Sequence, residues 1–545
     1  MKKCYVFFIF FALTISTIGQ TQFLRQDSIP SRHTGGYGNI VSGVDLDNDG
    51  KMEIYAVGNN VIDRDEEMVP RIWKFEYNGT SYDSVWGASL DIPLQNTWPA
   101  LAVGDMDGDG RKEIIWGPVN FIDPTTNPNP ARIVVFEAAG DGSDNMGVSD
   151  GFGGFTPNAK TTLTDTVGQN IRPFKFVMTD FNNDMKQEVV LVDRAPAPTG
   201  YDYRLHYAVV SVSDIPNDGN GSETWTIQSS GKNNALYAGT GLKWDVAVVN
   251  NLIFVFGQNG NVYRVKYENN NFTDLPIQSI PGGGSFKGTA VADINNDGTK
   301  EIFMAPWHLD TTNSGKIYVL QVAGDSLVPF PVASTKELGA NRLNGGDVGD
   351  LDGNGFPDFV FGTRNPNTPN NSVFRLSFKG GSLVDPNSYE LTRIDSLWFE
   401  VGGDLDEISV GNVDNDPLPE VLYSSGYTRG DPDDKPFPIV IVGAVVTDVK
   451  ADNNNIPDEF FLNQNYPNPF NPSTTIAFGL KTEMNVDLRI YNSLGQEVST
   501  VIDNQLLKAG TYNVNVTAKN LASGTYIYTL KAGNFTESKK MTLLK

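Results

Sequence analysis

The nine residues Asp105–Glu113, DMDGDGRKE, decide the fold, because the chain repeats their pattern five more times. The six copies, called loops 1 to 6 in chain order, begin at Asp45, Asp105, Asp180, Asp293, Asp350 and Asn412 and read DLDNDGKME, DMDGDGRKE, DFNNDMKQE, DINNDGTKE, DLDGNGFPD and NVDNDPLPE. Positions 1, 3, 5 and 9 of every copy carry an oxygen-bearing side chain. Because Ca²⁺ takes about six to eight oxygen ligands and a glycine lets the backbone curl around the ion, the pattern predicts a calcium loop.

Each loop is expected to bind one ion through the side chains at positions 1, 3, 5 and 9 and the backbone carbonyl at position 7. The predicted ligands are Asp45, Asp47, Asp49, Lys51, Glu53, Asp105, Asp107, Asp109, Arg111, Glu113, Asp180, Asn182, Asp184, Lys186, Glu188, Asp293, Asn295, Asp297, Thr299, Glu301, Asp350, Asp352, Asn354, Phe356, Asp358, Asn412, Asp414, Asp416, Leu418 and Glu420. Mg²⁺ is the alternative ion, but it prefers a stricter octahedron and keeps its water ligands. Calcium, up to six ions, is therefore the predicted cofactor.

The copies differ in quality. Loops 1 and 2 contain four acidic residues and the other loops three, so we expect the highest affinity in loops 1 and 2. Met185 and Pro417 replace the glycine at position 6 of loops 3 and 6, where we expect the lowest affinity. A single Asp-rich segment is often an ordinary turn, but six in phase favour metal binding.

The spacing of the loops indicates tandem units of about 60 residues. Successive loops begin 60, 75, 113, 57 and 62 residues apart, so one gap has room for two units. Within that gap, Trp244–Gly257 has the apolar runs that flank the other loops, but Asn250-Asn251 stands in place of a nine-residue connection. Two such residues can close a β-hairpin without a metal.

An alternating run follows each loop and the predicted hairpin. The runs are RIWKFEY from Arg71, RIVVFEA from Arg132, HYAVVSV from His206, NVYRVKY from Asn261, KIYVLQV from Lys316, SVFRLSF from Ser372 and PIVIVGA from Pro438. β-Branched and aromatic residues dominate these runs, and Gly, Asn, Asp and Pro separate them, which is typical of β-sheets. Seven runs predict seven units of an all-β fold.

The loop, its repeat length and tails such as IIWGP and IFMAP resemble the FG-GAP/VCBS repeats of integrin-α-type β-propellers. The resemblance implies four-stranded blades around an axis, with a calcium loop between the first two strands of a blade. We therefore expect a seven-bladed β-propeller over residues 20–447.

A different domain is expected after a polar linker over residues 448–459. Residues 460–545 contain short alternating runs separated by Gly, Asn and Pro turns, which predict a small Ig-like β-sandwich. Its motifs resemble the type A C-terminal sorting domain of the bacterial type IX secretion system. They are Asn465-Tyr466-Pro467-Asn468-Pro469-Phe470-Asn471-Pro472, Ile490-Tyr491-Asn492 with Gly495-Gln496-Glu497, Leu521-Ala522-Ser523-Gly524 and Lys539-Lys540-Met541. The resemblance implies the type IX machinery as a partner and export across the outer membrane, with removal of the domain as an option.

The first residues, MKKCYVFFIFFALTISTIG, predict a signal peptide over residues 1–19, with two lysines before an apolar run too short to span a bilayer. Its removal would take away the single cysteine, so the mature chain would have no disulfide and no transmembrane segment. The net charge of −24 excludes nucleic acid as an expected partner. We expect a protein that is secreted or held on the outer cell surface.

A ligand is expected on the rim opposite the calcium loops, because successive turns of an antiparallel blade alternate between rims. Aromatic and cationic residues in the turns after the second strands suit sugars, carboxylates or peptides. The candidates are Trp116, Arg194, Trp307, His308, Arg364, Tyr427 and Arg429. The alternative is that these residues are scattered and that the tryptophans pack between blades. A glycine-rich insertion, residues 140–154, is expected to be a mobile spacer, with a lid as the alternative.

The predicted function is a calcium-binding, surface or secreted binding and adhesion module, with an extracellular glycan or protein as its ligand. Nothing in the chain selects an enzyme, since it has three histidines and no nucleophile elbow or zinc helix. One alternative is a calcium-dependent polysaccharide lyase that uses Arg364 and His308. A second alternative is a structural surface protein without a specific ligand.

Overall fold

The computed structural model describes most of the chain and divides it into two compact units, Leu24–Gly443 and Met1–Phe23 with Ala444–Lys545. The predicted signal peptide lies outside the described residues. The described residues are 21–32, 36–59, 69–90, 98–119, 130–163, 171–194, 205–232, 234–237, 241–281, 284–307, 315–340, 342–364, 370–398, 403–405, 407–414, 416–425, 427–428, 437–446, 449–452, 457–471, 473–517 and 523–544.

The described part of the first unit contains seven four-stranded antiparallel sheets. Their strands are β2 (Tyr37–Val44), β3 (Glu53–Gly58), β4 (Arg71–Tyr77) and β5 (Tyr82–Ser89); β6 (Ala100–Gly104), β7 (Glu113–Gly117), β8 (Ile133–Glu137) and β11 (Ala159–Thr161); β12 (Pro173–Thr179), β13 (Glu188–Asp193), β14 (Tyr207–Val212) and β15 (Trp225–Ser230); β16 (Lys243–Val249), β17 (Leu252–Gly257), β18 (Asn261–Glu268) and β19 (Asn271–Ser279); β20 (Gly284–Ala292), β21 (Glu301–Trp307), β22 (Lys316–Ala323) and β23 (Ser326–Ser334); β24 (Leu343–Gly349), β25 (Asp358–Thr363), β26 (Asn370–Phe378) and β27 (Tyr389–Trp398); and β29 (Glu407–Gly411), β30 (Glu420–Ser424), β32 (Ile439–Val446) and β1 (Thr21–Ile29).

Four short strands and two 3₁₀ helices complete the description of this unit. Strand β9 (Val148–Ser149) pairs with β10 (Phe155–Thr156), and β28 (Gly403–Asp404) pairs with β31 (Tyr427–Thr428). The 3₁₀ helices are η1 (Lys336–Leu338) and η2 (Pro386–Ser388).

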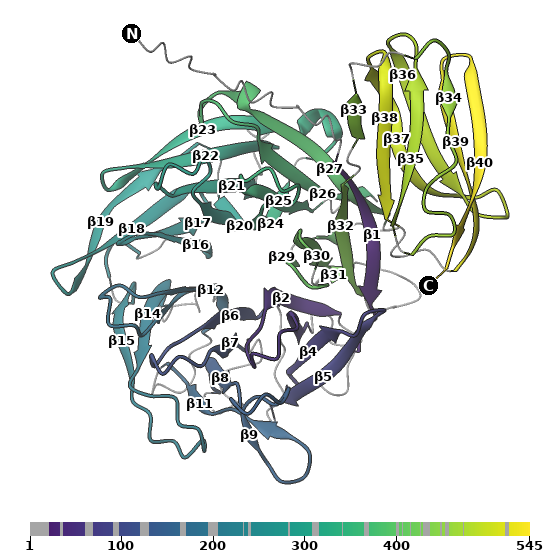
Figure 1. Ribbon diagram of the computed structural model, residues 1–545. Helices are drawn as coiled ribbons and strands as arrows, with labels where there is room; N and C mark the ends of the chain where they lie inside the picture. Colours follow the sequence, from purple (N-terminus) through teal and green to yellow (C-terminus); the bar gives the residue numbers. More distant parts are fainter. Residues whose placement is uncertain are drawn as a thin grey trace, which may run out of the picture. The chain divides into compact units, whose positions relative to one another are not determined.

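The sheets follow one another around a ring (Figure 1). The first strand of each sheet adjoins the first strand of the next, from β2 through β6, β12, β16, β20 and β24 to β29, and β29 adjoins β2. A glycine makes this last approach close: a Cβ on Gly43, whose φ is 72°, would lie 2.7 Å from Cα of Gly411. The arrangement is that of an all-β fold built from many small sheets, consistent with a β-propeller.

The hydrophobic core lies between neighbouring sheets. One buried cluster joins Tyr55 and Ile72 of the sheet that begins with β2 to Ile114, Trp116 and Phe136 of the next sheet. Second strands are buried along their whole length, as in β3, β7 and β13, because both of their faces are covered. Sheet packing therefore supplies the frame on which the loops are held.

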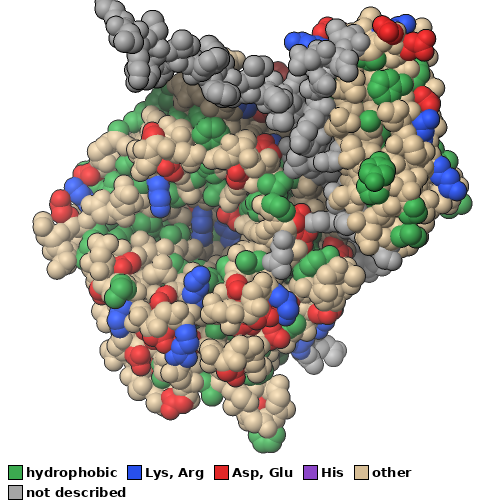
Figure 2. Space-filling view, viewed as in Figure 1, with side chains coloured by type: hydrophobic (Ala, Val, Ile, Leu, Met, Phe, Trp, Pro, Cys, Tyr) green, Lys and Arg blue, Asp and Glu red, His purple; other side chains and the backbone are tan. Residues whose placement is uncertain are grey.

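Ion pairs between sheets line the centre of the ring. Lys175 on β12 lies 2.6 Å from Asp245 on β16, and Lys287 on β20 lies 3.1 Å from Glu407 on β29. On the face drawn in Figure 2, basic and hydrophobic side chains gather in the central hollow. Ion pairs as well as apolar contacts therefore join neighbouring sheets near the centre.

The strand pattern expected from the sequence is observed. The seven alternating runs are the third strands of the seven sheets, β4, β8, β14, β18, β22, β26 and β32. Asn250-Asn251 joins β16 to β17 as a two-residue hairpin, with Val249 opposite Leu252. These short-range predictions are confirmed.

The insertion at residues 140–154 is anchored at Met146, which corrects the expectation of a mobile spacer for this part of it, although most of its residues are exposed. Met146 is fully buried, and its carbonyl accepts a 3.0 Å hydrogen bond from Nε1 of Trp86 on β5. The insertion therefore crosses from the sheet of β8 to the sheet of β2.

The second unit contains two further four-stranded sheets. They are β33 (Val449–Asp452), β38 (Gly510–Thr517), β35 (Ser473–Leu480) and β34 (Phe461–Leu462), and β37 (Glu497–Leu507), β36 (Met484–Tyr491), β39 (Gly524–Ala532) and β40 (Phe535–Leu543). Both sheets contribute to one buried cluster that includes Phe478, Leu488, Tyr528 and Met541. Strand β33, which pairs with β38, is formed by residues that the sequence assigned to the linker.

Candidate metal centre

All six loops occupy the same place in the fold. Each connects the first strand of a sheet to its second strand, for example β6 to β7 for loop 2, and the sheet that begins with β16 has the two-residue hairpin instead. The six acidic loops therefore lie at equivalent positions in six of the seven sheets.

The carboxylate at position 9 is anchored in the same way in every loop. It stands at the start of a buried second strand and accepts a hydrogen bond from the backbone N–H at position 2. The donors and acceptors are Leu46 and Glu53 at 2.8 Å, Met106 and Glu113 at 2.9 Å, Phe181 and Glu188 at 3.1 Å, Ile294 and Glu301 at 3.3 Å, Leu351 and Asp358 at 3.0 Å, and Val413 and Glu420 at 2.9 Å. One oxygen of each buried acid is thus hydrogen-bonded to the backbone of its own loop.

Position 6 needs a left-handed backbone in loops 1 to 5. Gly50, Gly110, Gly298 and Gly355 all have φ between 88° and 89°, and a Cβ there would meet nothing within 4 Å. The conformation, and not the space, therefore favours glycine. Met185 in loop 3 adopts a φ of 70° and is strained by comparison.

The structure gathers carboxylates in four of the six loops. Within each group one oxygen per residue lies within 4.8 Å of the others. The groups among the described residues are Asp105, Asp107, Asp109 and Glu113; Asp45, Asp47 and Glu53; Asp47, Glu76 and Asp144; Asp350, Asp352 and Asp358; and Asp414, Asp416 and Glu420. Loops 3 and 4 contribute no such group.

Asparagine at position 3 distinguishes loops 3 and 4 from the others. Nδ2 of Asn182 donates a 2.9 Å hydrogen bond to Asp184, and Nδ2 of Asn295 donates one of the same length to Asp297. This hydrogen bond from Asn295 lowers the pKa of Asp297. In these two loops an amide supplies the partner that an ion would supply elsewhere.

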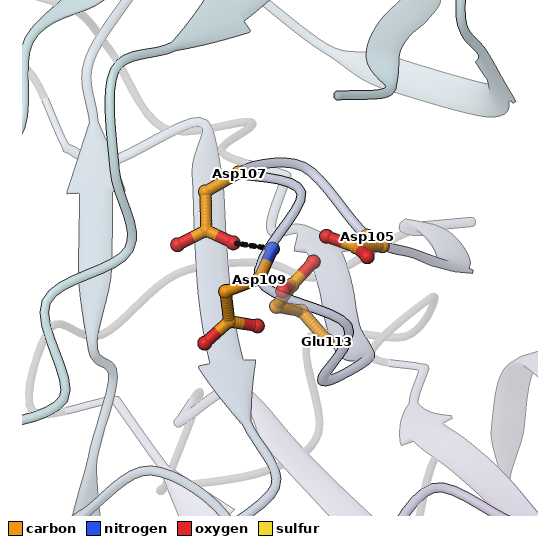
Figure 3. A group of neighbouring side chains, drawn as sticks. All are labelled: Asp105, Asp107, Asp109 and Glu113. Carbon is orange, nitrogen blue, oxygen red and sulfur yellow. Dashed lines mark hydrogen bonds between the residues drawn. The ribbon is translucent and has the colours of Figure 1, made fainter. Parts of the chain in front are cut away.

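Loop 2 has the fullest set of carboxylates. Figure 3 shows Asp105, Asp107, Asp109 and Glu113 converging, with the backbone N–H of Asp109 donating a 3.2 Å hydrogen bond to Asp107. Glu113 is completely buried, and its Oε1 has no hydrogen-bond partner. Burial raises the pKa of Glu113 to about 9. An ionised oxygen buried without a partner is costly, so Glu113 would need a bound cation to be ionised at neutral pH.

Two further contacts connect loop 2 to its surroundings. Oδ2 of Asp107 accepts a 2.8 Å hydrogen bond from the backbone N–H of Ile215, which belongs to the next sheet. Arg111 lies 2.6 Å from Asp109 and 2.9 Å from Glu137 on β8. Burial also raises the pKa of Glu137 to about 7. Loop 2 therefore contacts the next sheet as well as β8 of its own sheet.

The oxygen positions of loop 2 fit calcium. Two oxygens bound to one Ca²⁺ at roughly 2.3 to 2.6 Å can lie no more than about 5.2 Å apart. The four carboxylates of loop 2 are within 4.8 Å of one another, and all four are hard oxygen donors. Asp105, Asp107, Asp109 and Glu113 are the residues that would hold the ion.

Loop 1 has a similar set of acids but also a buried lysine. Lys74 on β4 is completely buried, and its Nζ lies 2.5 Å from Asp47, 2.8 Å from Glu53, 3.0 Å from Glu76 and 3.1 Å from Asp144. Burial alone lowers the pKa of Lys74, but hydrogen bonds to Asp47, Glu53 and Glu76 outweigh it, and the net shift is upward. An ammonium group therefore stands against the predicted ligands of loop 1.

Loop 5 has a comparable partner. Nε of Arg375 on β26 lies 2.8 Å from Asp358, and the same guanidinium contacts Asp352. Burial raises the pKa of Asp358 to about 6. Oδ1 of Asp358 has no hydrogen-bond partner, and Arg375 pairs with the other oxygen, Oδ2, whereas Lys74 reaches the corresponding free oxygen, Oε1, of Glu53.

Sequence reasoning missed the residues that come from third strands. Glu76 and Glu137 hold the sixth position of the runs RIWKFEY and RIVVFEA, opposite Glu53 and Glu113. Their shared position in the two runs could have identified them from the sequence. Asp144 lies in the insertion, for which the sequence offered no such signal.

The residues predicted for the opposite rim are only partly brought together. The guanidinium carbon of Arg194 lies 4.8 Å from the ring centroid of Trp98 and 5.6 Å from that of Phe286. The guanidinium carbon of Arg364 lies 4.9 Å from the ring centroid of Trp307. Phe286 and Trp307 are themselves 5.2 Å apart, so these side chains form one aromatic and cationic cluster. Trp116 is completely buried between sheets and does not belong to this surface. His308 and Arg429 lie outside the described residues, as does the side chain of Tyr427.

The sorting motif of the second unit is held against the last strand. Asn465 is buried and donates to the carbonyl of Pro467 and to Thr474, while Phe470 pairs by backbone hydrogen bonds with the segment after Met541. The motif is thus part of the folded unit. None of the helices among the described residues is long and apolar enough to cross a membrane.

Comparison with known proteins identifies both parts of the chain. The FG-GAP-like repeat model matches residues 45–116 and 243–304, and the secretion system C-terminal sorting domain model matches residues 464–543. No curated protein matches the chain.

Solved structures give only distant likenesses. BBS1N in complex with ARL6DN is 8% identical with a TM-score of 0.41, over 77% of this chain and 96% of that one. The N-terminal domain of Nup159 is 8% identical with a TM-score of 0.36, over 78% and 96%. The intramolecular trans-sialidase from Ruminococcus gnavus is 10% identical with a TM-score of 0.37, over 78% and 97%. At these TM-scores the likenesses support no argument.

The sorting domain points to the type IX secretion machinery and indicates export to the cell surface or secretion. The chain thus contains FG-GAP-like repeats at residues 45–116 and 243–304 and a type IX secretion system C-terminal sorting domain at residues 464–543.

Proposed function

We propose that this protein is a calcium-binding, seven-bladed β-propeller that acts as a binding and adhesion module outside the cell. Each four-stranded sheet of the ring would be one blade, with β1 completing the blade of β29, β30 and β32. The second unit would be an Ig-like β-sandwich that serves as the export address. A signal peptide over residues 1–19 would direct the chain to the periplasm first.

The observation that carries the calcium proposal is the buried Oε1 of Glu113 without a hydrogen-bond partner. Around it, Asp105, Asp107 and Asp109 bring three further carboxylates within 4.8 Å. The same anchoring of position 9 in six loops supports a shared role for the whole series. Extracellular calcium sites bind with Kd of roughly 10⁻⁴ to 10⁻³ M, which suits an exported protein.

The direct test is the calcium content of the purified full-length chain. Equilibrium dialysis at millimolar calcium, followed by metal analysis, should find bound calcium, and Glu113→Gln should remove one equivalent. Glu390→Gln, an exposed acid on β27, is the matched control and should change nothing. A wild-type chain without bound calcium would refute the proposal.

For the ligand, the aromatic and cationic cluster around Trp307 offers the best candidate surface. Guanidinium groups stacked on aromatic rings suit anionic sugars or carboxylate-bearing peptides. Binding of the purified chain to an array of acidic and neutral glycans, with Trp307→Ala as the variant, tests this part. Binding that Trp307→Ala leaves unchanged would assign the ligand to another surface.

A further inference from the structure

Lys74 takes the place that a metal ion takes in a calcium loop. Its Nζ contacts Asp47 and Glu53, the ligands at positions 3 and 9 of loop 1, at 2.5 and 2.8 Å. A calcium ion would have to contact the same two carboxylates at roughly 2.3 to 2.6 Å. The two cations therefore compete for the same oxygens and the same volume.

The contacts around Lys74 are built into the sheet. Lys74 pairs with Tyr55 across β3 and β4, two residues from the pair of Glu53 with Glu76. Its side chain is completely buried, so it cannot turn into solvent without moving its surroundings. Asp144 arrives from the insertion and adds a fourth carboxylate at 3.1 Å. Four acids from three segments, loop 1, β4 and the insertion, thus surround one ammonium group.

The neighbouring sheet shows the same register without the lysine. Val135 pairs with Ile115 across β7 and β8, two residues from the pair of Glu113 with Glu137. Val135 is completely buried and apolar. Neither Oε1 of Glu53 nor Oε1 of Glu113 has a hydrogen-bond partner, but Oε1 of Glu53 lies 2.8 Å from the ammonium of Lys74, whereas Glu113 has no ion pair among the described residues. The fourth residue of the seven-residue run, Lys74 in RIWKFEY and Val135 in RIVVFEA, therefore decides whether the loop contains its own cation.

The sixth sheet, which contains β26, has a different basic residue in the same position. Arg375 holds the same place in SVFRLSF as Lys74 in RIWKFEY, and it too contacts positions 3 and 9 of its loop, Asp352 and Asp358. Two loops, on sheets far apart in the sequence, thus have a basic residue at the same register position. Neither basic residue belongs to the nine-residue loop.

We infer that the buried ammonium of Lys74 replaces the divalent ion in loop 1, and that Arg375 does so less completely in loop 5. This inference rests on the proposed calcium function for the other loops. Loop 1 then binds no calcium despite its four acids. Loop 2, which has no internal cation, binds a calcium ion. The motif alone overstates the number of ions that this chain binds.

The test exchanges the residues at this register position in the full-length chain. Lys74→Met removes the internal cation from loop 1, and Val135→Lys places one behind loop 2. Calcium per chain, from equilibrium dialysis with metal analysis, should rise by one equivalent in Lys74→Met and fall by one in Val135→Lys. Lys266→Met is the control, because Lys266 lies on the third strand of the sheet without an acidic loop.

The melting temperature gives an independent readout. In chelator, Lys74→Met should melt below the wild type and should recover on addition of calcium. Val135→Lys should respond less to chelator than the wild type does. If Lys74→Met does not fold, the calcium content of Val135→Lys decides the question.

The outcomes separate this inference from the proposed function. Unchanged calcium content in both variants, with a wild type that binds calcium, would overturn the inference and leave the calcium function intact. A wild type without calcium would refute the calcium function, yet a calcium-dependent recovery of Lys74→Met would still support the role of the lysine.

Discussion

Loops 1 and 2 have the same four acidic ligands, the same left-handed glycine and the same place between first and second strands, but they differ in what lies behind them. Behind loop 1 stands Lys74, and behind loop 2 stands Val135. In the first case the buried acid Glu53 has an internal partner, and in the second case one oxygen of Glu113 has no hydrogen bond. The comparison teaches that the strands around an acidic loop, and not its carboxylates alone, decide whether the buried acid at position 9 has an internal cation.

The strongest test of this comparison changes the position-9 acid in each loop. Glu53→Gln should lower the free energy of unfolding by about 2–3 kcal/mol with or without calcium, because it breaks a buried, charge-assisted contact with Lys74. Glu113→Gln should be close to neutral in chelator, since no internal cation loses a partner. Urea denaturation with and without calcium measures both. Equal losses for the two variants in chelator would end the distinction.

Removal of calcium from the wild type should have the next largest effect. An ion present at tenfold excess over its Kd adds about 1.4 kcal/mol of stability. We expect this contribution from loop 2, so chelator should lower the melting temperature, and Glu113→Gln should remove this part of the calcium response. Magnesium at the same concentration is the control, because the loop does not offer the strict octahedron that it prefers. An unchanged melting temperature of the wild type in chelator would contradict the role of loop 2.

Much of this architecture could be predicted because its signals are local. Six loops of fixed spacing, seven third strands and the Asn250-Asn251 hairpin follow from short sequence windows. The partners of the loops could not be read in this way, because Lys74 acts on loop 1 only through the register between β3 and β4. Trp116 shows the same limit: a tryptophan after a strand can face a rim or a core, and here it is buried in the core.

Loop 3 extends the comparison to the backbone. Met185→Gly should raise the free energy of unfolding by about 0.5–1 kcal/mol, because Met185 holds a φ of 70° that favours glycine. The side chain is 76% exposed, so little packing is lost. Gly298→Met in loop 4 is the matched reverse change, at a φ of 88° with open space around its Cβ, and should lower stability by a similar amount. Denaturant midpoints measure both, and a loss of stability in Met185→Gly would contradict the assigned strain.

The smallest expected effect concerns the insertion. Asp144 lies 3.1 Å from Lys74, but its side chain is 37% exposed, so the contact is partly screened by solvent. Asp144→Asn should therefore cost at most about 0.5–1 kcal/mol, and the cost should shrink at high salt. In the Lys74→Met background the same change should cost nothing, because the partner is gone, and a double-mutant cycle measures the difference. A cost that persists without Lys74 would show that Asp144 acts through the packing of the insertion, and loop 1 would then owe its internal compensation to Asp47, Glu53 and Glu76 alone.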